Sequence, residues 1–243
     1  MFRTVTAAAV AAAAFAASAC NVGAKAETRD PGSSVSRNYP VAAFDKIEVA
    51  GPYDVIVTTG GAPSASATGG DKLLDETEVV VEGNTLKIRP KNNKGINWSW
   101  GKSGSVKFAV TTAMLNGAAV AGSGGISVDK IKGDFIGTVG GSGDLELRAI
   151  AGGAVELSVG GSGSIAAAGT AQSTKIAIGG SGDVDASGLA AKTAIVAVGG
   201  SGSASANASD SAKVSIAGSG DVAITGGAKC EISKVGSGDV TCG

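Results

Sequence analysis

The side chains best suited to chemistry in this 243-residue chain are carboxylates beside a glycine-rich motif. Asp144, Asp183, Asp221 and Asp239 each follow a Gly-Ser-Gly tripeptide directly. Paired carboxylates can cleave a polysaccharide as acid and base, and a ladder of them can bind calcium. A polysaccharide cleft also needs aromatic neighbours, but no aromatic residue follows Phe135. Calcium-binding β-rolls set one residue between the last Gly and the Asp, and this sequence does not. The pattern therefore favours a structural turn over catalysis or a metal site.

The composition of the chain excludes several other chemistries. Because His is absent, a serine nucleophile would lack its usual base, and the commonest metal ligand is missing. The formal net charge of −1 gives no nucleic-acid footprint. No helical stretch follows the glycine-rich turns, which excludes dinucleotide-binding and phosphate-binding loops. We predict a protein without catalytic residues, cofactor, metal site or nucleic-acid partner.

One segment, residues 91–105, differs from the rest and holds both tryptophans of the chain. Trp98 and Trp100 alternate, so both rings face one side of an extended chain, with Lys94 and Lys102 nearby. Aromatic faces stack on sugars and also favour membrane interfaces. The alternative is that the segment folds back and buries its rings over the domain. These four side chains are the candidate contacts to a glycan or to another envelope or surface protein.

The first residues predict export. Residues 1–19 carry Arg3, a short apolar stretch and a small-residue cleavage site, and Cys20 follows directly. This order resembles a bacterial lipobox, which implies lipidation of Cys20 and a membrane partner through that anchor. Ordinary secretory cleavage, there or after Ala26, is the alternative. Asn21 in place of Asp favours the outer membrane by analogy with other lipoproteins. We therefore expect an outer-membrane lipoprotein, or a periplasmic or cell-surface protein, of a Gram-negative bacterium.

Residues 20–38 are polar and aperiodic, which predicts a disordered tether.

The cysteine count agrees with this location. The chain has three Cys, and lipidation of Cys20 leaves Cys230 and Cys242 as an even pair in an oxidising compartment. Both stand at odd offsets from Ser237 and flank it almost symmetrically, so both should point into the last coil. We predict a disulfide between them, with two separate buried thiols as the alternative.

A repeat must position all of these residues. The tripeptide Gly-Ser-Gly recurs at intervals of 18 to 20 residues, with its Ser at positions 123, 142, 162, 181, 201, 219 and 237. A fixed period near 19 indicates stacked units, and it is too short for a propeller blade. The chain has 25 Val and 15 Ile against 8 Leu, which favours strands over helices.

The register of the repeat follows from offsets around each turn Ser. Residues three and five positions away are mostly apolar, and residues four positions away are polar or small. This alternation predicts a parallel β-helix with odd offsets buried. Glycine suits the turns because it adopts positive φ and because stacked corners leave little room. Lys234 interrupts an apolar column in the last unit, which we interpret as an end cap.

The region before residue 116 is interpreted as a degenerate version of the same unit. Residues 47–57 overlay residues 214–224 almost position for position, and residues 79–88 repeat the alternation around Gly83. The sequence therefore predicts an all-β domain over residues 39–243, with degenerate coils at 39–115, regular coils at 116–243 and about ten coils in all. The larger residues expected to plug the N-terminal end are Phe44, Tyr53, Leu73, Leu74, Phe108, Met114 and Leu115.

The segment FDKIEVAGPYDVIVTTG, followed by tandem GSGD-V turns, resembles the bacterial family called "putative auto-transporter adhesin, head GIN domain". The resemblance covers about residues 41–243. It implies an exported, often lipid-anchored, right-handed parallel β-helix, and it brings no catalytic motif. We expect a surface binding or adhesion module. A purely structural envelope protein and a polysaccharide-active enzyme are the alternatives.

Overall fold

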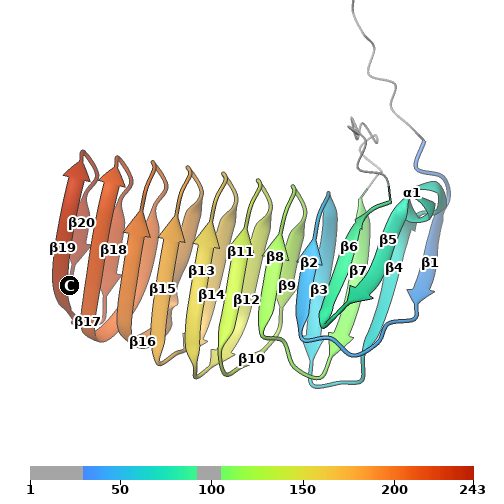
Figure 1. Ribbon diagram of the computed structural model, residues 1–243, viewed down its shortest axis with the longest axis horizontal. Helices are drawn as coiled ribbons and strands as arrows, with labels where there is room; N and C mark the ends of the chain where they lie inside the picture. The colour runs from blue at the N-terminus through green and yellow to red at the C-terminus, as the bar shows by residue number, and fades with distance from the viewer. Residues whose placement is uncertain (1–29, 92–104) are drawn as a thin grey trace, which may run out of the picture.

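The computed structural model describes residues 30–91 and 105–243, which form a β-solenoid with one short helix (Figure 1). Each regular coil contributes one strand to each of two parallel sheets that face each other across the core. We call the sheet whose strands lead into the Gly-Ser-Gly turns sheet A, and the sheet whose strands leave them sheet B. Alternation of apolar and polar residues produces this arrangement, because successive side chains point to opposite faces of a strand.

Sheet A is built from strands that pair in parallel along the solenoid. In spatial order they are β6 (Thr85–Pro90), β2 (Lys46–Val49), β8 (Gly117–Val120), β11 (Phe135–Val139), β13 (Ala154–Val159), β15 (Ser173–Ile178), the second parts of β16 (Asp183–Val198) and β17 (Ala204–Gly218), and β19 (Lys229–Gly236).

Sheet B runs beside it in the same order. Its strands are β7 (Val106–Thr112), β3 (Tyr53–Thr59), β9 (Gly125–Val128), β12 (Asp144–Ala151), β14 (Ser164–Thr170), the first parts of β16 and β17, β18 (Val222–Thr225) and β20 (Val240–Cys242). The two-residue strand β10 (Ile131–Lys132) pairs with the end of β12 at a corner.

The solenoid has about 7 turns rather than the ten that the sequence predicts. These turns follow chain order from β8 and β9 onward, and each carries a Gly-Ser-Gly tripeptide. The two strand pairs before them do not follow chain order. The coil of β2 and β3 lies between the later pair β6 and β7 on one side and β8 and β9 on the other. The region before residue 116 is therefore not a simple run of degenerate coils.

Antiparallel strands close the N-terminal end of the solenoid. β4 (Ser64–Gly70) pairs antiparallel with β7, and β1 (Ser34–Tyr39) pairs antiparallel with β4. The end of the expected tether is thus a strand, because a partner edge was available to residues 34–38. β5 (Thr77–Glu82) and β6 form a hairpin around residues 83–84, so residues 79–88 are not a coil. Between β4 and β5, helix α1 (Asp71–Asp75) buries Leu73 and Leu74.

A single apolar core confirms the predicted register. The columns at odd offsets are buried along the solenoid, as the run Val139, Val159, Ile178 and Val198 illustrates. At the N-terminal end, the expected large residues Phe44, Tyr53, Leu73, Leu74, Phe108 and Leu115 are all buried. Met114 is 56% exposed, so its expected place in the plug is wrong. It lies in the segment between β7 and β8, outside any strand.

Close stacking of the turns, rather than backbone conformation, explains most of the turn glycines. The third residue of these turns never adopts positive φ in the described coils. A Cβ added to Gly163 would lie 2.1 Å from the carbonyl oxygen of Gly143, and one on Gly182 would lie 2.2 Å from that of Gly163. The lack of room therefore explains the third residue of each turn, whereas Gly218 and Gly236, the first residues of the last two turns, also adopt positive φ.

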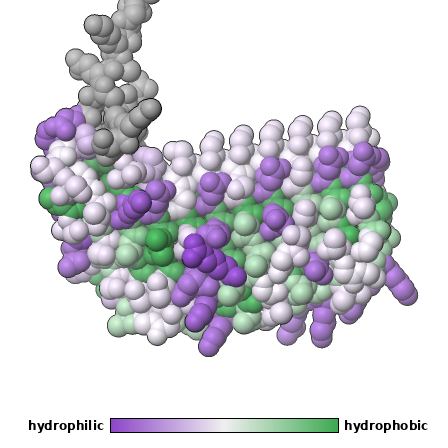
Figure 2. All heavy atoms as spheres, turned by 180° about the vertical axis from the view of Figure 1, so that it is seen from behind, coloured by the Kyte–Doolittle hydropathy of each residue, from purple (hydrophilic) through white to green (hydrophobic). Residues whose placement is uncertain are grey.

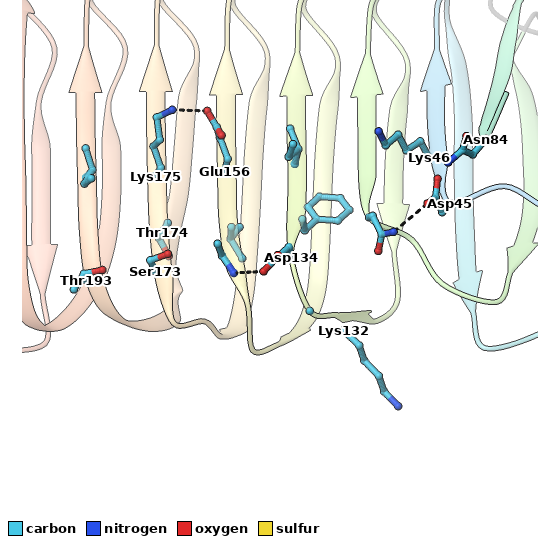
Figure 3. A pocket seen from close by; sticks show the side chains of 17 residues that line it. Asp45, Lys46, Asn84, Lys132, Asp134, Glu156, Ser173, Thr174, Lys175 and Thr193 are labelled. Atoms are coloured by element: carbon cyan, nitrogen blue, oxygen red, sulfur yellow. Dashed lines mark hydrogen bonds and ion pairs between the residues drawn. The ribbon is translucent and has the colours of Figure 1, made fainter. Parts of the chain in front are cut away.

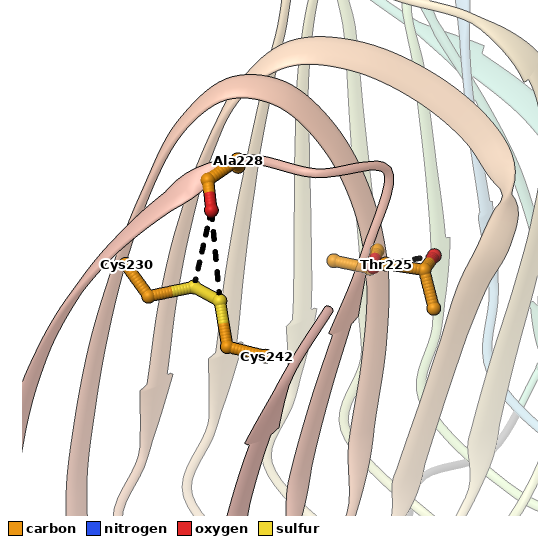
Figure 4. Close-up of a disulfide and its surroundings, with 5 residues drawn as sticks. Thr225, Ala228, Cys230 and Cys242 are labelled. Atoms are coloured by element: carbon orange, nitrogen blue, oxygen red, sulfur yellow. Dashed lines mark hydrogen bonds between the residues drawn. A yellow bond between two sulfur atoms is a disulfide. The ribbon is translucent and has the colours of Figure 1, made fainter.

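The C-terminal coil carries the predicted disulfide. Cys230 and Cys242 are bonded, with Cα atoms 6.6 Å apart, and the carbonyl oxygen of Ala228 lies beside both sulfurs (Figure 4). Lys234 stacks on Ile216 in the inward column, and its ammonium group donates to the Gly238 carbonyl at 2.7 Å. A cross-link and a charge therefore cover the open end.

No helix in the described parts of the chain is long and apolar enough to cross a membrane.

Candidate functional site

The sequence-predicted contact residues Trp98, Trp100, Lys94 and Lys102 lie outside the described residues, and so does Cys20. The strands that flank residues 91–105 are β6 and β7, which occupy neighbouring positions in sheets A and B. The chain thus leaves sheet A at the end of β6 and enters sheet B at the start of β7, as it does around each Gly-Ser-Gly turn of the regular coils.

The four turn aspartates lie in one outward column of sheet B and form a row rather than a cleft. Figure 2 shows hydrophilic side chains in a row below the pale turns at the edge of this sheet. The Ser164 hydroxyl donates to Asp144 at 2.7 Å, and the Ser203 backbone N–H donates to Asp183 at 2.8 Å. These carboxylates link successive coils. In residues 30–91 and 105–243, no group of three or more Asp, Glu or Cys side chains is placed to hold a metal ion.

A hollow lies on the outer face of sheet A, over strands β2, β8, β11, β13, β15 and β16 (Figure 3). It has a volume of about 820 Å³. A second hollow of about 420 Å³ continues from Thr193 and Ile195 across β17 to β19. Together they form a shallow groove, the sheet A groove, that runs along the solenoid axis to its C-terminal coil.

One column of outward side chains runs along this groove at right angles to the strands. In spatial order its members are Lys46, Gly117, Ile136, Glu156, Lys175, Ile195, Lys213 and Glu231. We call this set the groove column. Each member is the direct register partner of the next, so neighbouring members are separated by about 4.8 Å.

Two isoleucines in the groove column face solvent. Ile136 is 55% exposed and Ile195 is 50% exposed, while the strands on which they lie bury their alternate residues completely. They stand three coils apart, about 14 Å. Leaving such side chains in water loses the free energy that their burial would give, about 25 cal/mol for each Å². Both side chains are available to a partner surface, and contact with that surface would bury them.

The charged members of the groove column are mostly paired within the chain. Lys175 contacts Glu156 at 2.7 Å, and Lys213 contacts Glu231 at 3.3 Å. Lys46 has no ion-pair partner among the described residues, and its aliphatic chain lies over Gly117. The column therefore offers both signs of charge on one face of the sheet.

Two buried polar atoms lie at the margin of the groove. Asp45 accepts a hydrogen bond from the Asn116 amide through Oδ2 at 3.1 Å, but its buried Oδ1 has no partner. The Oγ1 of Thr174, a residue 3% exposed, also has none. Both residues line the hollow.

The column beside the groove column makes the face flat. Its members across the middle strands are Ala119, Thr138, Ser158, Ala177, Ala197 and Ser215. Side chains of this size let a large surface approach closely. Such a face suits non-covalent contact with another surface.

Sequence reasoning missed the groove column, although a signal was available. From Gly117 onward, its members stand six residues before each turn Ser. The residues at this even offset are not all polar or small, whereas those four positions from the turn Ser are. Inspection of this offset would have found Ile136 and Ile195 on the outward face.

Fold and site together define a β-solenoid that presents a flat, mixed apolar and charged face and has no assembled catalytic group in the described residues. The family model described as "putative auto-transporter adhesin, head GIN domain" matches residues 43–228. The chain belongs to this family, as the sequence resemblance predicts. A search of functionally curated proteins gave no match.

Solved structures share the fold over almost their whole length. A "putative lipid binding protein" from Parabacteroides distasonis is 25% identical, with a TM-score of 0.69, 87% of this chain covered and 97% of that one. A "putative adhesin" from Bacteroides fragilis is 22% identical, with a TM-score of 0.71 and coverage of 86% and 96%. Another from Parabacteroides merdae is 18% identical, with a TM-score of 0.62 and coverage of 86% and 96%.

Proposed function

We propose that this protein is an exported, lipid-anchored surface module that binds another surface without catalysis, and that the sheet A groove is its contact face. The observation that carries the proposal is the exposure of Ile136 and Ile195 in the groove column, among charged side chains of both signs and beside a column of small residues. Family membership and the names of the structural relatives support adhesion or binding as the class of function.

The two alternatives account less well for this face. A purely structural solenoid gains nothing from isoleucines held in water, because a polar residue would serve an unpaired outward position better. A polysaccharide-active enzyme needs two carboxylates converging on one bond. The turn aspartates instead line up along sheet B, and the groove carboxylate Glu156 is held by Lys175.

Attachment measurements test the contact face. Beads carrying the protein are offered to intact bacterial cells, to a glycan array and to lipid vesicles. We expect binding to at least one surface, and about tenfold weaker binding by the double variant Ile136→Asp, Ile195→Asp. The matched control is Ile56→Asp, because Ile56 is 59% exposed on the opposite sheet. Equal binding by the wild type and the double variant would remove the groove from the proposal.

The tryptophan segment is a second proposed contact. Trp98→Ala and Trp100→Ala should weaken binding to a glycan array if aromatic stacking holds a sugar. The pair Lys94→Ala and Lys102→Ala reports the contribution of charge in the same assay. Unchanged array profiles for all four variants would exclude this role.

Export and anchoring have their own test. Residues 1–19 would direct export, and acylated Cys20 would hold the domain at the membrane. The wild type should partition into detergent and show the mass of an acylated N-terminus. Cys20→Ser should leave the membrane fraction. A wild-type mature mass without acyl chains would contradict the anchor.

A further inference from the structure

The groove column is complementary to itself when its order is reversed. Its centre lies between Glu156 and Lys175, which carry opposite charges. One step outward on each side stand Ile136 and Ile195, so an apolar residue matches an apolar residue.

The two ends of the column continue this complementarity, and the step inside each end does not. Gly117, over which the aliphatic chain of Lys46 lies, corresponds to Lys213, so this step adds no complementary pair. At the two ends, Lys46 corresponds to Glu231, again with opposite charge.

We propose that the sheet A groove binds a second copy of this chain, face to face, in a symmetric dimer. The inference rests on the proposed function, because it names the partner of that same face. The two-fold axis lies between the copies, parallel to the strands, and passes between Glu156 and Lys175. It therefore reverses the order of the coils in the second copy. Each Glu156 then faces the Lys175 of the other copy, as an isologous contact requires.

The alternative axis along the solenoid is disfavoured by charge. It would set each residue of the groove column opposite its own copy, with Glu156 against Glu156 and Lys175 against Lys175. Like charges held in register oppose association, whereas complementary charges fix the register of an interface. The reversed arrangement sets no member of the groove column opposite its own copy, and it pairs opposite charges at the centre and at both ends of the column.

The size and shape of the face suit such a contact. Eight strands at about 4.8 Å spacing, with about six residues of 3.3 Å in each, give about 750 Å² per copy. A stable interface buries about 800 Å² on each partner. The flat column beside the groove column brings only small residues together, with Thr138 opposite Ala197 and Ser158 opposite Ala177, so the two sheets can approach closely.

A charge-exchange experiment tests the partner. Sedimentation of the purified protein should show a monomer–dimer equilibrium in the micromolar range. Ile136→Lys and Ile195→Asp, each alone, should weaken dimerisation about tenfold or more. The double variant should recover, because Lys at 136 then faces Asp at 195 of the other copy. Within one chain these positions are about 14 Å apart and are screened, so recovery must arise between chains. Ile56→Asp should dimerise like the wild type.

Cross-linking tests the orientation. With a short bis-maleimide, the double variant Thr138→Cys, Ala197→Cys should give covalent dimers, whereas Thr138→Cys alone should give few. Efficient dimers from Thr138→Cys alone would overturn the reversed arrangement.

The outcomes separate this inference from the proposed function. A wild-type monomer throughout the concentration range would overturn the dimer. If Ile136→Asp, Ile195→Asp still lost attachment to cells that lack the protein, the groove would bind a different partner and the proposed function would stand. A dimer that Ile136→Lys and Ile195→Asp leave unchanged would overturn the dimer face.

Discussion

At the scale of single residues, turn glycines differ sharply in the space around them. A Cβ on Gly182 would lie 2.2 Å from the Gly163 carbonyl oxygen, whereas the nearest atom to a Cβ on Gly179 is 4.0 Å away. We expect Gly182→Ala to lower the free energy of unfolding by about 2–3 kcal/mol, because backbone in the next coil must move. Gly179→Ala should change it by less than about 1 kcal/mol. Urea unfolding of the two variants measures the difference, and equal midpoints would contradict the stacking explanation.

Tyr53 couples the stability of the N-terminal end to pH. Its ring is fully buried, and burial raises the pKa of its hydroxyl to about 12. The hydroxyl donates to Thr77 Oγ1 at 3.2 Å, and Thr77 in turn donates to the Leu73 carbonyl.

This shift predicts a loss of stability in alkali. The pKa of an unfolded Tyr is about 10, so the unfolded chain releases a proton between pH 10 and 12 that the folded chain retains. The contribution is therefore complete below about pH 10 and falls by roughly 2–3 kcal/mol as the pH approaches 12. Tyr53→Phe lacks this term, so its melting temperature should fall less than that of the wild type between pH 9 and 12. Parallel curves would show that another group controls the alkaline limit.

At the scale of elements, the last coil depends on its disulfide. β20 has three residues and no strand beyond it, so packing alone holds it weakly. Closing a loop of about 13 residues contributes roughly 3 kcal/mol in the chain-entropy model. With Cys230→Ser and Cys242→Ser together, we expect faster hydrogen exchange in β19 and β20 and little change in β12 to β15. The wild-type protein in reductant should show the same hydrogen exchange as this double variant. Unchanged exchange in β20 would show that stacking suffices.

The strands of the regular coils could be predicted because alternation and turn spacing act on each coil independently. Val159 and Ile178 are buried where the offset from the turn Ser requires it. The hairpin of β5 and β6 could not be distinguished from a coil, because both alternate with period two and differ only in the partner strand. The same ambiguity hid β1, whose partner β4 lies 30 residues away along the chain.

The candidate site was less accessible to sequence reasoning. The Cys230–Cys242 pair could be predicted, because both residues flank one turn at inward positions. The groove column consists of outward residues that stack on one another in successive coils. It is found from the sequence only when the residues six positions before each turn Ser are compared between units. Lys46, the first member of the groove column, comes from the coil of β2 and β3, which is inserted out of chain order. The period of the repeat does not reveal this insertion.

At the scale of the whole molecule, we expect Lys234 to oppose extension of the solenoid by a second copy. It lies at an inward position of the last coil, where its ammonium group donates to Gly238 and stands 3.9 Å from Asp239. An inward charge on an edge strand opposes pairing with another copy. We expect Lys234→Val to give species larger than a dimer in light scattering. Thr241→Val, an outward change in the same coil, should not. A Lys234→Val protein without larger species would show that other features protect the edge.

The insertion of β2 and β3 between two later strand pairs constrains how the gene can change in length. Recombination between tandem repeats can add or remove a whole coil only where one coil follows the next in the chain, which is the case from β8 onward. The coil of β2 and β3 pairs with β6 and β7 on one side and with β8 and β9 on the other. A recombination event in this region would therefore separate that coil from one of its two neighbours. We therefore expect natural relatives to vary in length after Val128, in steps of about 19 residues, with each step changing the length of the solenoid by about 4.8 Å.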